Sequence, residues 1–368
     1  MKVETLTGPV APQDLGIVAM REHLLLGRHG WHWAPEVRFD RAAAFESVLA
    51  RLEAFKKRGG GTLVDASGIT LGRNVPFYRR LSELSGVHIV ASTGFGEQSS
   101  SIPGHFLGRA YRVSTDARQH WVREIPGHFY SSHGESKEYL MFLFYNELTE
   151  GMAAPCMIRT GIKAGIVQTG SAWDGVSRLE EFSIRAAAMA ARHAGVSVIT
   201  TSAGQARRHF ELLSAEGLEA QRIVIGHCDD ARAVDLGRDR SFAEKGAYVA
   251  YDHIGWEKDA PHAMADDERV ALVKAMVQAG YAERVVLSSS AVGAAMGLPA
   301  SSHGYERLLA DFVPRLDRAG IGEAVLETLL VDTPRRLLAA SQDEEAAEQL
   351  RAFAEGFRSA SRQQRWDV

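Results

Sequence analysis

The stretch Gly16-Ile-Val-Ala-Met-Arg21-Glu22-His23-Leu-Leu-Leu26 decides the fold of this chain. Residues 16–20 form a short apolar run, which predicts a buried β-strand. Arg21 and His23 follow this run where the strand is expected to end. Strands buried on both faces belong to parallel sheets, and polar residues at their carboxyl ends are typical of binding and catalytic sites. The stretch therefore predicts the first strand of a parallel sheet and the position of a site.

Further short apolar runs alternate with helical patterns along the chain, as parallel sheets with crossover helices require. With the first run, the predicted strands cover residues 16–20, 62–65, 88–92, 164–167, 197–201, 222–226, 248–252 and 284–288. Helical patterns cover residues 41–58, 178–194, 205–216, 231–245, 266–279 and 305–319. Eight strands with intervening helices predict an α/β fold, a (β/α)8 barrel formed as a single domain by residues 1–341. Residues 342–368 are predicted to form a C-terminal packing helix.

The composition is that of an ordinary globular enzyme or binding protein. The chain has 368 residues, 45% of them hydrophobic and 24% charged, with a formal charge of -4. The chain therefore has no excess of basic residues of the kind that nucleic-acid-binding proteins use to contact phosphates. Two cysteines, no apolar leader and no long apolar run favour a cytoplasmic protein that does not span a membrane. We expect a small-molecule substrate as partner, and a homodimer is compatible with the sequence.

The segment 97–134 interrupts the alternation of strands and helices. It is rich in Ser, Gly, His, Arg and aromatic residues, and it follows the third predicted strand. Segments of this length inside a compact domain are usually lids, binding loops or subunit contacts. A lid or pocket wall and a surface or oligomer contact both remain open for it.

Six groups of residues near strand ends occur in an order that resembles the phosphotriesterase family of the amidohydrolase superfamily, which includes phosphotriesterase-like lactonases. They are Thr5-Leu-Thr-Gly-Pro-Val10 with Leu15-Gly16 and Glu22-His23-Leu-Leu-Leu26, Gly60-Gly-Thr-Leu-Val-Asp65, Ala91-Ser-Thr-Gly-Phe95, Thr160-Gly-Ile-Lys-Ala-Gly-Ile166, Val224-Ile-Gly-His227-Cys-Asp-Asp230 and Thr333-Pro-Arg-Arg-Leu-Leu338. The resemblance covers nearly the whole chain. It implies a (β/α)8 barrel whose site lies at the carboxyl ends of the strands.

The resemblance also implies two divalent metals, held by four histidines, a bridging carboxylated lysine or glutamate, and an aspartate. In this chain those six positions fall on Arg21, His23, Gln168, Ser202, His227 and Ser290, or on Ser289 if the last register slips by one. Two of these positions, His23 and His227, are still histidines. The two positions at which the family has an anion fall on Gln168 and Ser290, whose side chains are neutral. A guanidinium has no lone pair for a metal and repels a divalent cation. We therefore expect no metal cofactor.

The same strand ends supply the candidate catalytic residues. Arg21 can bind an anionic group through paired hydrogen bonds. Alternatively, it can have a structural role and fill the space that the metals would otherwise occupy. His23 and His227 can act as general acid and base, or they can be polar residues satisfied by their neighbours. Ser202 or Ser290 is also a candidate nucleophile, but the sequence around them shows no elbow-turn motif and no orienting third residue.

Further residues are candidates for substrate binding. Gln168, Ser202 and Ser290 can hydrogen-bond a ligand in place of the metals. Asp252 and His253 end the seventh predicted strand, at a position that the family resemblance places near the substrate. The loop aromatics Trp33, Phe95 and Trp256 can form an apolar pocket wall, or a protein interface.

The sequence thus predicts a barrel without a binuclear centre that carries out a metal-independent reaction on a small, anionic organic molecule. Hydrolysis, elimination, cyclisation and isomerisation remain open. One alternative is a non-catalytic binding or partner protein on the same scaffold. Another is a mononuclear metal-dependent hydrolase of esters or lactones, in which His253, His303 or Asp252 joins His23 and His227 as a ligand.

Overall fold

The computed structural model of this protein describes residues 2–104, 136–154, 158–260 and 263–339. Its main sheet has the order β12-β11-β10-β9-β8-β5-β4-β3-β13, and all neighbours are parallel. The strands are β3 (Ile17–Gly27), β4 (Gly60–Asp65), β5 (His88–Thr93), β8 (Ile166–Gly170), β9 (Val198–Thr201), β10 (Ile223–Ile225), β11 (Tyr248–Tyr251), β12 (Val285–Leu287) and β13 (Val292–Met296).

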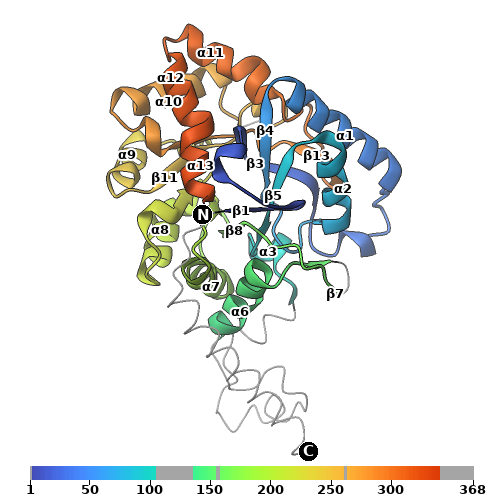
Figure 1. The fold of residues 1–368 in the computed structure, drawn as a ribbon. Coiled ribbons are helices and arrows are strands. Elements are labelled where there is room, and N and C mark those ends of the chain that lie inside the picture. Colours follow the sequence, from blue (N-terminus) through green and yellow to red (C-terminus); the bar gives the residue numbers. More distant parts are fainter. Residues whose placement is uncertain (1, 105–135, 155–157, 261–262, 340–368) are drawn as a thin grey trace, which may run out of the picture.

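The last two strands close the sheet into a barrel. β12 pairs with β11, whereas β13, which follows it directly in the chain, pairs with β3. The two edges of the sheet therefore meet within residues 285–296, and the short strands act together as the eighth strand of a (β/α)8 barrel. Figure 1 shows the helices arranged around the outside of these strands.

The principal outer helices are α1 (Arg41–Lys57), α2 (Val75–Ser85), α6 (Ser136–Thr149), α7 (Arg178–Ala194), α8 (Ala206–Ala215), α9 (Leu236–Glu244), α10 (Asp266–Gln278), α11 (Val313–Arg318), α12 (Glu323–Glu327) and α13 (Thr333–Leu338). Local signals set several of their ends. A capping box of Ser177 and Glu180 starts α7, and Gly195 ends it in a left-handed conformation. The predicted helix 305–319 instead contains the π-helical turn η9 (Leu308–Phe312) before α11.

The minor elements lie at the chain start and around the long segment. β1 (Val3–Thr5) and β2 (Gly8–Val10) form a hairpin, and β6 (Ala153–Ala154) and β7 (Ile158–Arg159) form another. The short helix α3 (Gln98–Ser101) follows β5. Most of the predicted loop 97–134 and the predicted helix 342–368 lie outside the described residues.

All eight predicted strands are present, but the prediction that the first strand ends before Arg21 is wrong. β3 continues to Gly27, and His23 is paired with Val292 of β13. The register of β3 against β4 shifts between Ala19 and Glu22. The strand continues because β13 extends beyond β12 and provides β3 with a hydrogen-bonding partner. Arg21 and His23 are therefore held in a strand rather than in a loop.

The interior of the barrel is built in layers. Its apolar layer comprises Met20, Val64, Val90, Ile166, Ile199, Val224, Ala250 and Val286, which belong to one buried cluster. Side chains two positions further along a strand point to the same face. Gln168, Asp252 and Ser288 therefore follow the apolar layer toward the carboxyl ends, and all three are buried. The top of the barrel interior is consequently polar.

The part of the chain that the structure describes contains no helix that is both long and apolar enough to cross a membrane.

A buried ion pair fastens α6 to the barrel. The guanidinium of Arg73 donates to both carboxylate oxygens of Glu147 at 2.7 Å, and each side chain is 1% exposed. Thr93 donates a further hydrogen bond to Glu147, and Arg73 also reaches the carbonyl of Ser92. The helix that follows the long segment is thus tied to β5 by a fully satisfied pair.

Replacing Arg73 by Met should destabilise the protein by about 3–5 kcal/mol, because the carboxylate of Glu147 would remain buried without its cation. Urea unfolding followed by circular dichroism measures the effect. The matched control is Arg79→Met, which removes an exposed, solvent-screened ion pair with Glu83 and should leave the stability almost unchanged. Equal losses in the two variants would contradict a structural role for the buried pair.

Candidate functional site

Arg21 lies across the top of the barrel interior. Its side chain starts on β3 and donates from Nη1 to the carbonyl of Thr200 on β9, at 3.3 Å. Its Nε is 3.6 Å from Oδ2 of Asp252, which follows β11. Burial lowers the pKa of Arg21, and the charges of Asp252 and Glu22 offset part of this effect. The guanidinium thus connects strands on opposite sides of the barrel and is almost completely buried.

Asp252 also holds His227. Its Oδ1 accepts hydrogen bonds from the backbone N–H of His227 and from the ring Nδ1, each at 2.9 Å. Burial raises the pKa of Asp252, but His227 and Arg21 more than compensate, and the net shift is downward. Because Nδ1 of His227 faces a carboxylate, Nε2 is the ring atom left to bind a proton or ligand. The structure thus joins Arg21, Asp252 and His227 in one cluster.

A second histidine–aspartate pair lies against the first. The ring of His253 stacks on that of His227, with centroids 4.3 Å apart and planes 12° apart. Nδ1 of His253 is 3.1 Å from Oδ1 of Asp229, and the buried Arg269 donates to the other oxygen of this carboxylate. Burial lowers the pKa of His227, whereas Asp229 outweighs burial and raises the pKa of His253.

His23 lies in the same part of the barrel. Its Nδ1 is 3.1 Å from the hydroxyl of Ser67. Burial, together with the charges of Arg21 and His227, lowers its pKa to about 3. The imidazole is therefore neutral near pH 7. It can accept a proton only weakly. His227 is the better placed of the two candidate bases because the carboxylate of Asp252 holds its Nδ1, whereas Nδ1 of His23 faces a hydroxyl.

Sequence reasoning did not find the role of Glu22. Its carboxylate accepts hydrogen bonds from the hydroxyl of Ser288 and from the backbone N–H groups of Ser289 and Ala291. These contacts brace β3 against the segment between β12 and β13. Burial raises the pKa of Glu22 to about 8, although the three hydrogen bonds oppose the shift. The available signal was a carboxylate between Arg21 and His23, directly after an apolar run. Asp229 was visible in a quoted motif but was not assigned a role.

Gln168 is buried within the polar layer. Its amide lies against Gly68 and Gly96, which have no side chains. A Cβ atom added to Gly68 would lie only 2.6 Å from Nε2 of Gln168. Nε2 has no hydrogen-bond partner among the described residues. This is an unpaired donor at a position where the family resemblance places a bridging anion.

Three residues at predicted site positions have strained backbones. Ser202, His227 and Ser290 have φ values of 76°, 59° and 44°, and they are the non-glycine residues with positive φ in the described ranges. Left-handed conformations are unfavourable for residues with a Cβ and tend to occur at functional sites. The barrel therefore retains an unfavourable geometry at the ends of β9, β10 and β12.

Ser290→Gly should raise the free energy of unfolding by about 1 kcal/mol, because glycine accepts positive φ without a steric penalty. It also removes a buried hydroxyl that lacks a partner. Thermal and urea unfolding provide the measurement. Ser302, an exposed residue without positive φ, provides the control, and Ser302→Gly should lower stability slightly. A loss of stability in Ser290→Gly would show that the serine side chain has a structural role.

The three predicted wall aromatics lie in different environments. Trp256 contacts the site: its ring is 5.0 Å from that of His253, and its Nε1 donates to the carbonyl of Ser289 at 2.6 Å. Phe95 is 1% exposed and packs in the hydrophobic core against Phe144. Trp33 is 81% exposed on the turn η2 (Trp31–Trp33). Thus Trp256, of these three, is placed beside the histidines.

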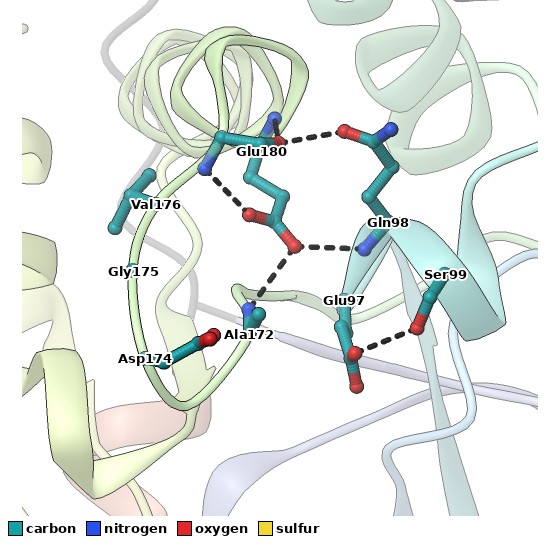
Figure 2. A pocket seen from close by; sticks show the side chains of 9 residues that line it. Glu97, Gln98, Ser99, Ala172, Asp174, Gly175, Val176 and Glu180 are labelled. Atoms are coloured by element: carbon teal, nitrogen blue, oxygen red, sulfur yellow. Dashed lines mark hydrogen bonds between the residues drawn. The ribbon is translucent and has the colours of Figure 1, made fainter.

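A cavity of about 430 Å³ opens on the same rim, between α3 and the loop that follows β8. Figure 2 shows Glu180 among the residues that line it, and its carboxylate accepts hydrogen bonds from the backbone N–H groups of Gln98, Ala172 and Ser177. Glu97 and Asp174 add two further carboxylates to its lining. The buried carboxylate is already satisfied, so its primary role is to join the two loops.

A buried histidine that the sequence did not single out supports the rim. Nε2 of His209, on α8, is 2.8 Å from the hydroxyl of Ser171, which follows β8. Burial lowers the pKa of His209 to about 4. The pair joins α8 to the loop that precedes α7. A single histidine in a helical pattern gave no sequence signal for this contact.

His209 should make the protein less stable in acid. Its pKa is near 6.5 in the unfolded chain and about 4 when folded, so the unfolded state binds more protons between these values. The stability that the neutral form provides, roughly 3 kcal/mol, should disappear as pH falls from about 6.5 to about 4. In His209→Gln the free energy of unfolding should fall less steeply over this range. The exposed variant His32→Gln is the control, and identical slopes in both variants would contradict the prediction.

One group of side chains has the spacing of metal ligands. His227, Asp252 and His253 each offer a donor atom, and these atoms lie within 4.8 Å of one another. The carboxylates on the Nδ1 atoms resemble the arrangement that orients metal-bound histidines. However, Asp252 already interacts with both Arg21 and His227.

Comparison with known proteins agrees with this architecture. The model of the phosphotriesterase family matches residues 1–128 and 127–338. The phosphotriesterase homology protein of Mycobacterium tuberculosis (strain ATCC 25618 / H37Rv) is 28% identical, over 91% of this chain and 97% of the relative. The N-acetyltaurine hydrolase of Homo sapiens is 24% identical over 92% and 97%. The structure of the organophosphorus hydrolase from Deinococcus radiodurans has a TM-score of 0.79 and 30% identity, covering 92% of this chain and 97% of that one.

Fold and site together define a (β/α)8 barrel with a polar site at the carboxyl ends of its strands. The chain belongs to the phosphotriesterase family.

Proposed function

We propose that this protein is a metal-independent hydrolase of a small organic molecule that carries an anionic group. One observation carries the proposal: a buried guanidinium, that of Arg21, is paired with Asp252 at the strand ends where the family resemblance places two metals. Arginine supplies a fixed positive charge without a metal.

The residues at these strand ends do not fit a two-metal centre. Arg21 has no lone pair to offer, and its charge repels divalent ions. Gln168, Ser202 and Ser290 supply no anion to balance two divalent cations. Asp252 is present, but Arg21 and His227 already share its two oxygens. Removing the anions and the metals together avoids leaving unpaired charges in the barrel.

The side chains that remain at these strand ends can each take one role in hydrolysis. His227 is oriented by Asp252 and is partly accessible, its side chain being 20% exposed, so its Nε2 can accept a proton from an attacking water. Arg21 stabilises negative charge that develops nearby. The ring of His253 stacks on that of His227, and the ring of Trp256 is tilted by 58° against His253, so a substrate can pack against aromatic side chains beside His227.

The relatives support hydrolysis among the reactions that the sequence left open. Several are N-acetyltaurine hydrolases, which by their name cleave a small amide, and a structural neighbour is an organophosphorus hydrolase. N-acetyltaurine is itself anionic. A small amide or ester with an anionic group is therefore the first substrate class to test.

A second candidate is a mononuclear metal-dependent hydrolase. The spacing of His227, Asp252 and His253 favours it, since catalytic zinc sites usually have three protein ligands. The guanidinium of Arg21, 3.6 Å from Asp252, disfavours it because it repels a cation at this position.

Metal analysis and kinetics together test the proposal. Protein purified without chelators should contain far less than one metal ion per chain, and EDTA should not lower its hydrolysis of N-acetyltaurine, simple esters or lactones. His227→Gln should lower kcat by about 10²–10⁴-fold, the usual contribution of a general base. His32→Gln, on the exposed turn η2, is the control and should retain activity.

One tightly bound zinc or manganese per chain, with activity lost on chelation, would contradict the proposal and favour the mononuclear hydrolase. Failure of the wild-type protein to turn over any member of the panel would favour a binding protein on the same scaffold.

A further inference from the structure

The hydroxyl of Ser67, two residues beyond β4, determines which ring nitrogen of His23 carries the proton. Its Oγ has three polar neighbours: the carbonyl of Leu25 at 2.9 Å, Oδ2 of Asp65 at 3.3 Å and Nδ1 of His23 at 3.1 Å. A hydroxyl donates one hydrogen bond and has two lone pairs that accept. Only one of these three neighbours can therefore receive the proton of Ser67.

Two of the three neighbours act as acceptors. The carbonyl of Leu25 has no proton, and Oδ2 of Asp65 already accepts a hydrogen bond from the backbone N–H of Leu24 at 2.8 Å. If Ser67 donated to His23, its oxygen would face the carbonyl oxygen of Leu25 at 2.9 Å with no hydrogen between them. Ser67 therefore accepts from Nδ1 of His23. A neutral imidazole has one ring proton, so Nε2 carries a lone pair.

The groups behind Ser67 are fixed. Asp65 also accepts a hydrogen bond from the backbone N–H of Ser67, at 3.2 Å, and both residues are 0% exposed. The backbone N–H of Leu25 donates to the hydroxyl of Tyr78 on α2, at 3.2 Å. The acceptors that compete for the proton of Ser67 thus belong to β3 and β4 themselves. The tautomer of His23 follows from the pairing of these two strands.

The opposite nitrogen of His23 is open to a ligand. His23 is partly exposed, and its Nε2 makes no hydrogen bond within the part of the chain that the structure describes. His23 follows Arg21 by two positions on β3, which places both side chains on the same face of the strand. Burial and, next, the charge of Arg21 lower the pKa of His23, so the guanidinium acts on this ring.

We propose that Ser67 and Asp65 are positioning residues that hold His23 as the Nδ1–H tautomer, so that its Nε2 accepts a hydrogen bond from an uncharged N–H or O–H group. The surroundings select this partner. The lone pair repels an acceptor such as a carboxylate oxygen, and Arg21 repels a metal ion or an ammonium group. The partner is thus the amide N–H of a substrate or the O–H of a water molecule.

His227 presents the same kind of atom to the site. Oδ1 of Asp252 faces its Nδ1 at 2.9 Å, so its Nε2 also carries the lone pair. Neither histidine has a proton on Nε2 to give in its neutral form, so neither begins the reaction as a general acid. The role of His23 rests on the proposed function: His227 takes the proton of the attacking water, and His23 binds a donor without exchanging its own proton.

Nitrogen-15 NMR of the full chain, labelled at histidine, tests the tautomer directly. The two ring nitrogens give different signals in each tautomer, and the signals lost in His23→Gln identify those of His23. At pH 7 we expect a protonated Nδ1 and an unprotonated Nε2. Ser67→Ala should replace this pattern by a mixture of tautomers, and Ser67→Thr, which keeps the hydroxyl, should restore it.

Two ligands that differ in one group identify the donor. N-acetyltaurine has an amide N–H, and its ester analogue 2-acetoxyethanesulfonate has an oxygen in its place. A shift of the Nε2 signal of His23 with the amide alone assigns the donor to the substrate, whereas no shift with either ligand assigns it to water. In Ser67→Ala, kcat/KM should fall about tenfold, the effect of one hydrogen bond. The loss affects the amide alone in the first case and both ligands in the second.

A proton on Nε2 of His23 in the wild-type protein would overturn the inference, as would a wild-type pattern that persists in Ser67→Ala. Zinc or manganese bound to Nε2 would overturn it as well, because metal-bound histidines share this tautomer. The NMR measurement needs no turnover, so the two proposals fail separately. The expected tautomer in a protein without metal-free hydrolysis rejects the proposed function alone, whereas a protonated Nε2 in an active protein rejects the role of His23 alone.

Discussion

The arrangement of the site depends on the carboxylate of Asp252. One of its oxygens faces Arg21 and the other holds His227, so a single group sets the positions of the fixed cation and of the candidate base. In a buried environment neither charge is stable alone, because desolvation costs several kcal/mol for an unpaired ion. Arg21 can be accommodated inside the barrel because Asp252, which directly follows β11, places a carboxylate 3.6 Å from its Nε.

Comparable buried pairs fix the surroundings of this cluster. Arg269 supports Asp229, which in turn orients His253, and Arg73 clamps Glu147 of α6 against β5. Each pair joins elements that are distant in the sequence. Such contacts limit the movement of the strand ends, and a site of fixed dipoles and charges needs little reorganisation when it binds a ligand. The barrel thus combines an apolar lower layer, which stabilises it, with a polar upper layer that is held in place.

Three strained residues lie at strand ends around this site. Ser202, His227 and Ser290 keep left-handed backbones at three strand ends, although in this chain two of them are serines. The backbone geometry at these positions therefore does not depend on a histidine or aspartate side chain.

The sequence by itself determined the eight strands and the barrel, because apolar runs that alternate with helical patterns are local signals. It also determined both ends of α7, since Ser177 and Gly195 act within a turn of the helix. Only the tertiary structure decided the length of β3, the partner of Arg21 and the stacking of His227 on His253. These features depend on the register of strands far apart in the chain, and local periodicity carries no information about which residues that register brings together.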